Sequence, residues 1–181
     1  MLKGHHDPAT TPGIISRADF SARRPTMTTA SQPPSIQELK RTLVAAGLEI
    51  YRTRPDAVHL AERPRDNQIL DAGISVRPAL PDGSFEVRVV MRCQRSDFLR
   101  EPAEELYEKV RELARANVAT RGFHEMETRE QRMPDPGDKS KTLDIWYEVV
   151  FGKTFTTTQD AIDDAKYALS LEKYVRGPGQ P

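Results

Sequence analysis

Apolar and polar residues alternate most regularly between residues 84 and 94, where every odd-numbered position from 85 to 93 is apolar. Side chains on a strand point alternately to its two faces, so this pattern predicts a strand with one buried face and one face in water, typical of antiparallel sheets. A second stripe of the same period is predicted over about 142–152. Its inward residues are Leu143, Ile145, Tyr147, Val149 and Phe151.

Four further strands are predicted from shorter runs. Apolar positions at 48, 50, 58 and 60 flank the turn Arg54-Pro55-Asp56, which indicates a hairpin. A third strand is expected from about Ile69 to Arg77, with Gly73 marking a bulge. Another is expected over about 122–132, joined to the 142–152 strand by a loop rich in proline and glycine.

Helical spacing of apolar residues predicts three helices. The first covers about 36–46, where Ser35 and Glu38 have the spacing of a capping box and Gly47 suits the end. The second runs from about Pro102 to Thr120. The third begins after Thr157 and has Tyr174 on its flank.

The resulting order is α-β-β-β-β-α-β-β-α, an α+β fold with an antiparallel sheet of about six strands and helices mainly on one face. Residues 35–175 are expected to form this single domain. Residues 1–34, rich in proline, serine and threonine, are expected to be a disordered tail, and 176–181 a disordered C-terminus. Met27 resembles a bacterial protein start, so residues 1–26 are expected to lie upstream of the natural sequence.

Composition narrows the classes of function. The 181 residues include 27 Lys plus Arg and 27 Asp plus Glu, a net charge of zero. Nucleic-acid and membrane-surface proteins usually carry a basic excess, so neither partner is expected. The single cysteine and the absence of an apolar signal segment indicate a cytoplasmic protein. No cofactor or metal is expected.

Several polar residues resemble catalytic or metal-binding clusters, but strand alternation or their place in the chain gives each of them a structural interpretation. His5, His6 and Asp7 lie in the expected tail, whereas His59 and His124 are expected to be partly buried structural residues. Cys93 is interpreted as a core residue. Glu125 and Glu127 are expected to share a water-facing strand face, with His124 on the other. The segment 135–138 is expected to be a hairpin loop rather than a calcium site.

Trp146, the only tryptophan, is the feature that asks for a partner. Its position opposes the inward stripe, so it projects from the outer face of the sheet. It needs cover, from the first or third helix, from the tail, or from a partner. Tryptophan and arginine are common in interface hot spots. The predicted partner-binding residues are therefore those that share its face, namely Trp146, Arg88, Arg92, Val90 and Glu148.

The order of elements over about residues 35–175 resembles that of class I type III secretion chaperones. That resemblance rests on topology alone, so no functional residue is transferred from those chaperones to this chain. It implies a cytoplasmic homodimer that binds a polypeptide and catalyses nothing. The leading hypothesis is accordingly a non-catalytic module that binds another protein or a second copy of itself.

Two alternatives belong to other classes. One is a small-ligand or nucleotide-related enzyme whose polar groups gather between the sheet and the second helix, at Arg88, Arg92, His124, Glu125 and Asn117. The other is RNA binding on the sheet, which would need more exposed aromatic residues than Trp146 alone.

Overall fold

The computed structural model describes residues 34–63, 68–79 and 83–179. Three predictions fall on residues outside these ranges. They are the disordered tail as far as residue 33, the natural start of the protein at Met27, and the place of His5 and His6 in the tail. Within them, no helix is long and apolar enough to cross a membrane.

The described residues contain the three predicted helices, α1 (Ile36–Ala45), α2 (Ala103–Ala116) and α3 (Thr158–Leu169). Two short 3-10 turns, η1 (Arg95–Asp97) and η2 (Ala119–Arg121), flank α2. The predicted extension of the second helix to residue 120 is wrong, since the backbone leaves helical geometry one residue beyond Ala116.

The predicted caps at the helix starts are confirmed. The Ser35 hydroxyl accepts the Glu38 backbone N–H at 3.3 Å, and the Glu38 carboxylate accepts the Ser35 N–H at 2.8 Å. Thr157 caps α3 by accepting the Asp160 N–H at 3.1 Å. Each bond satisfies a backbone donor that a helix start leaves free.

Six strands form a continuous antiparallel path in the order β1-β2-β3-β4-β6-β5, and a short seventh strand, β7, pairs in parallel with β4. The α+β class and the order of the first nine elements are confirmed, with β7 an addition to them. Tyr174 lies in β7 rather than on the third helix, so that expectation is wrong. The strands are β1 (Ile50–Thr53), β2 (Val58–Glu62), β3 (Leu70–Ala79), β4 (Ser84–Gln94), β5 (His124–Pro134), β6 (Thr142–Phe155) and β7 (Tyr174–Val175).

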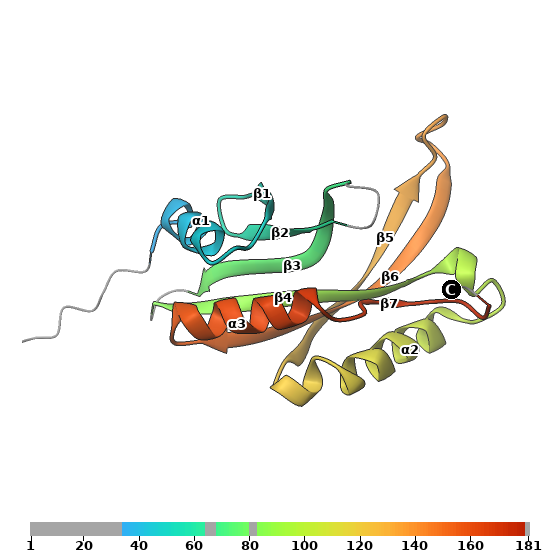
Figure 1. Cartoon of the computed structure of the whole chain (residues 1–181). Coiled ribbons are helices and arrows are strands. Elements are labelled where there is room, and N and C mark those ends of the chain that lie inside the picture. Colours follow the sequence, from blue (N-terminus) through green and yellow to red (C-terminus); the bar gives the residue numbers. More distant parts are fainter. Residues whose placement is uncertain (1–33, 64–67, 80–82, 180–181) are drawn as a thin grey trace, which may run out of the picture. The chain divides into compact units, whose positions relative to one another are not determined.

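The core lies on one face of this sheet. The odd-numbered side chains of β4 are buried as predicted, and they form a single cluster with buried side chains from all three helices. Figure 1 shows α3 along β3 and β4, and α2 along β6. The helices therefore leave the even-numbered side chains of β4 on the opposite, outer face.

The tip of the β5–β6 hairpin differs from the prediction. Leu143, expected in the inward stripe, is 64% exposed, whereas Tyr147, Val149 and Phe151 are buried. Figure 1 shows the tip standing clear of α1, α2 and α3, so these three helices leave that end of the stripe uncovered.

An irregularity at Gly73 shapes the outer face. Opposite β2, the pairing advances two residues along β2 but four along β3, around Gly73, which has a φ of 68°. The predicted irregularity is confirmed. β3 pairs with β4 only from Ile74 onward, and β7 pairs with β4 further along, at Arg92 and Cys93. β3 thus separates from β4 beyond the bulge, and the outer face opens there.

Candidate functional site

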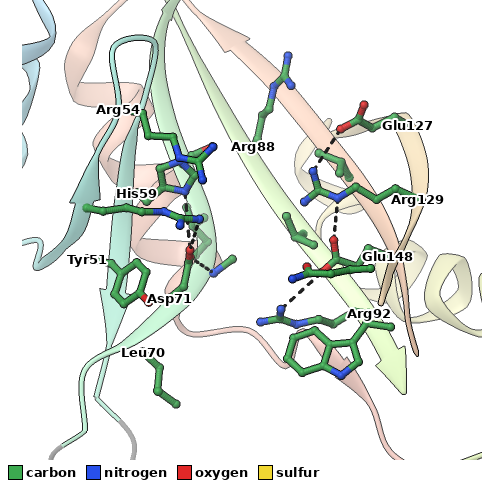
Figure 2. Close-up of a pocket in the computed structure, with 18 of the residues that line it drawn as sticks. Tyr51, Arg54, His59, Leu70, Asp71, Arg88, Arg92, Glu127, Arg129 and Glu148 are labelled. Atoms are coloured by element: carbon green, nitrogen blue, oxygen red, sulfur yellow. Dashed lines mark hydrogen bonds and ion pairs between the residues drawn. The ribbon is translucent and has the colours of Figure 1, made fainter. Parts of the chain in front are cut away.

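A pocket of about 490 Å³ lies on the outer face, where β3 separates from β4. Its lining includes side chains from all seven strands. Figure 2 shows two groups facing each other across it, one from β1 to β3 and one from β4, β5 and β6. The structure places every predicted partner-binding residue in this lining, namely Trp146, Arg88, Arg92, Val90 and Glu148. Their role as partner contacts stays a prediction.

Strand register explains why these five residues meet. Arg92 pairs with Glu148, and Val90 pairs with Val150, across the β4–β6 ladder. Directly opposite residues of an antiparallel pair point to the same face, so the even-numbered side chains of both strands lie on the outer face, and those near the opening line the pocket.

Trp146 is half-buried in a stack formed within the chain. The Arg92 guanidinium carbon lies 4.1 Å from the centre of the Trp146 ring and 4.6 Å from that of Tyr174. The Trp146 and Tyr174 rings meet edge to face at 6.3 Å, and Arg92 donates a hydrogen bond to the Tyr174 hydroxyl. Burial raises the pKa of Tyr174. β7 therefore supplies the cover that the sequence led us to expect from a helix, the tail or a partner.

A column of ion pairs runs along the β4–β6–β5 wall of the pocket (Figure 2). Glu148 lies between Arg92, at 3.5 Å, and Arg129, at 2.7 Å, and Arg129 reaches Glu127 at 3.7 Å. The Glu148 side chain is only 2% exposed. It lies on the outer face, as predicted, and arginines from both neighbouring strands shield it from water.

A bulge in β5 places Arg129 on the face that forms this wall. Glu125 pairs with Phe151 and Glu127 with Val150, so Met126 is an extra residue between them. Glu125 therefore faces α2, where two hydrogen bonds from Arg111 lower the pKa of its carboxyl, while Glu127 faces the pocket. The prediction that Glu125 and Glu127 share a face is wrong. Met126 lies over Gly152, which has no side chain to displace it.

The opposite wall carries a second charged group, around His59. Asp71 accepts from Arg52 at 3.2 Å and lies 3.9 Å from His59 Nδ1. Burial lowers the pKa of His59, and the charges of Arg52 and Arg54 lower it further, against the opposing effect of Asp71. The His59 side chain is 20% exposed, so its predicted partial burial is confirmed.

The lining carries six arginines against four carboxylates, a formal excess of two positive charges. All four carboxylates are in ion pairs with arginine, and they are Asp56, Asp71, Glu127 and Glu148. Two buried N–H donors of the stack, Arg92 Nε and Trp146 Nε1, have no acceptor within the described residues. A buried donor left without an acceptor costs about 1–3 kcal/mol.

The alternative site between the sheet and the second helix does not form. Arg88 and Arg92 line the outer pocket, on the face away from α2, and His124 is exposed rather than partly buried. Of the four strand residues proposed for that site, Glu125 contacts α2, through an ion pair with Arg111. The groups expected to gather there lie on opposite faces of the sheet.

The remaining candidates have structural surroundings. Cys93 is buried, and burial raises its pKa to about 11. The segment 135–138 forms the predicted hairpin loop, in which Asp135 Oδ1 accepts the Gly137 N–H at 2.7 Å. Among the described residues, no group of three His, Cys, Asp or Glu side chains is placed to hold a metal ion.

Sequence reasoning missed the β1–β3 wall of the pocket. His59 lies between the buried Val58 and Leu60, so alternation alone would have placed it on the outer face. Arg129 carries no such signal, because the bulge at Met126 changes which β5 residues face the pocket.

Comparison with known proteins gives no relative. No family model matches the chain, no curated protein matches it, and no solved structure matches its fold.

Proposed function

We propose that this domain is a non-catalytic binding module, and that it holds an extended segment of a partner polypeptide in the outer-face pocket. The observation that carries this proposal is the make-up of the site. The lining draws residues from all seven strands, and its two charged walls face each other where β3 and β4 separate. An extended segment lying between these walls would contact both of them.

The chemistry of the lining supports a polypeptide occupant. Arginine, tryptophan and tyrosine are the residue types most enriched at interface hot spots, and the stack of Arg92, Trp146 and Tyr174 brings one of each together. Each carboxylate of the pocket is held by an arginine, so the lining has the character of a fixed recognition surface. The resemblance of the element order to secretion chaperones, which rests on topology, points the same way.

A second candidate function is the binding of a small molecule. A volume of about 490 Å³ falls in the usual range of ligand pockets. A small molecule would contact one wall of the pocket or the junction of the two, whereas a peptide would contact both.

Trp146 gives a direct test, because it is the only tryptophan and lies in the pocket. The full chain is titrated with a set of arrayed ten-residue peptides, and Trp146 fluorescence is recorded. We expect a subset to change the emission and bind with saturation. The double variant Arg52→Glu and Arg88→Glu, with one change on each wall, is expected to weaken that binding by at least tenfold, since each wall loses a positive charge. Its melting temperature shows whether the fold is retained.

The matched control is the double variant Arg100→Glu and Arg132→Glu. Both of these arginines are exposed and lie outside the lining. Equal weakening in both double variants, or no saturable peptide, would contradict the proposal. Sedimentation of the free chain measures its oligomeric state. A dimer indicates a second copy of the chain as the partner, and a monomer indicates another protein.

A further inference from the structure

One arginine of the pocket differs from the other five. Arg52, Arg77, Arg88, Arg92 and Arg129 each form an ion pair with a carboxylate. Arg54 has no such pair within the described residues. Its guanidinium is therefore the charge in the lining that no side chain of the described chain neutralises.

Arg54 is held by its backbone at a defined place. It opens the turn between β1 and β2, where its N–H donates to the Ala57 carbonyl at 2.8 Å. Figure 2 shows its side chain beside the His59 ring on the β1–β3 wall. His59 Nδ1 faces Asp71 at 3.9 Å, which leaves Nε2 without a polar partner among the described residues. The Arg54 guanidinium and His59 Nε2, which donates when it carries a proton, thus line the pocket without an acceptor among the described residues.

The local charge favours an anion at this point. Arg52, Arg54, Arg77 and Arg88 give four positive charges, against three negative charges on Asp56, Asp71 and Glu86, a sum of +1. Each of the three carboxylates is already engaged, Asp71 by Arg52, Asp56 by Arg77 and Glu86 by Arg88. Protonation of His59 would raise the sum to +2.

We propose that Arg54 and His59 form an anion subsite in the pocket, which takes a carboxylate or phosphate group of the occupant. The subsite rests on the pocket of the proposed function and adds the chemistry of its ligand. Arg54 offers its guanidinium fork to two oxygens, the geometry that suits carboxylate and phosphate groups. His59 Nε2 donates to a third position when that nitrogen carries the proton.

Binding at this subsite is linked to protonation of His59. In the free protein the pKa of His59 is lowered by burial and by Arg52 and Arg54, and Asp71 and Asp56 oppose that effect. A bound anion favours the charged imidazolium and raises this pKa. Affinity for an anion of constant charge therefore increases as the pH falls through the bound-state pKa, and levels off below the free-state pKa.

Sulfate is a suitable probe, because it keeps two negative charges across the range in which histidine titrates. The full chain is titrated with sodium sulfate at constant ionic strength, and the His59 imidazole resonances are followed by NMR between pH 5 and pH 8. We expect a saturable shift, tighter at the lower pH. Arg54→Gln is expected to weaken it about tenfold or more, the effect of losing a charge-assisted hydrogen bond. His59→Gln, followed through backbone amides, is expected to abolish the pH dependence.

Arg54→Gln removes an exposed side chain without a carboxylate partner, so its melting temperature serves to show that the fold is retained. Arg100→Gln is the control and is expected to bind sulfate like the wild type. A sulfate response that Arg54→Gln leaves unchanged, or the absence of a saturable shift at His59, overturns the subsite.

The source of the anion is resolved by comparing N-acetylglutamate, N-acetylphosphoserine and inorganic phosphate. Tighter binding of either amino acid derivative than of phosphate supports a polypeptide source, and equal binding of all three supports the subsite with a free anion as ligand. If sulfate binds through Arg54 but no peptide binds, the subsite stands and the proposed function fails. If peptides bind equally well to wild type and Arg54→Gln, the subsite fails and the proposed function stands.

Discussion

At the scale of single residues, Glu148 occupies the most demanding position in the pocket. A carboxylate that is 2% exposed is stable only because Arg92 and Arg129 pair with it from the neighbouring strands. Removing one partner of a buried pair leaves the other charge desolvated, which usually costs 3–5 kcal/mol. The Arg92 side chain is itself only 11% exposed, so it has little access to water as a substitute.

We therefore predict that Glu148→Ala lowers the free energy of unfolding by about 3 kcal/mol, measured by urea denaturation. Glu127→Ala removes a carboxylate from the same column, but its side chain is 50% exposed. It is expected to cost about 0.5 kcal/mol or less, like other exposed pairs. Similar losses in the two variants would show that burial of Glu148 does not set its contribution.

At the scale of elements, alternation predicts strand faces well until a bulge shifts the register. The stripe of β4 and the caps of α1 and α3 were predictable because each depends on residues close in sequence. The bulge at Gly73 had a signal, since glycine inside a strand is unusual. The bulge at Met126 had none, because it depends on the space above Gly152 on the next strand. β7, two residues long, carries too short a pattern to be recognised.

Gly73 lets us predict what the bulge of β3 contributes. Its φ of 68° strains any other residue, and an added Cβ would lie 3.3 Å from the Val90 carbonyl oxygen on β4. Gly47 has a similar φ of 84° with nothing within 4 Å of an added Cβ. We expect Gly47→Ala to cost about 1 kcal/mol in unfolding free energy, from backbone strain alone. Gly73→Ala is expected to cost about 2 kcal/mol, since β3 and β4 must also move apart.

Chemical denaturation of both variants measures the difference, and amide exchange of β3 locates it. Equal costs would mean that the contact with Val90 relaxes freely and that the bulge is set by the backbone of Gly73 alone.

At the scale of the whole described domain, the C-terminal segment completes the pocket that the earlier strands open. β3 leaves β4 beyond Gly73, and β7 pairs with β4 further along, where the Arg92 N–H donates to the Lys173 carbonyl at 3.0 Å. Lys173 is buried and reaches Glu62 of β2 at 3.4 Å. The segment that leads into β7 thus contacts both β4 and β2, an arrangement that depends on residues more than a hundred positions apart.

This arrangement predicts that Trp146 reports on β7. Deleting residues 173–181, or making the single change Tyr174→Ala, removes the ring that packs edge to face on Trp146. We expect both variants to shift Trp146 emission to longer wavelength and to raise its quenching by acrylamide, because water then reaches a ring that β7 covers in the wild type. Tyr174→Phe keeps the ring and removes only the hydroxyl that accepts from Arg92, so its emission is expected to stay close to that of the wild type. If deletion leaves the emission unchanged, Arg92 and the sheet shield Trp146 without β7, and the C-terminal strand does not close this end of the pocket.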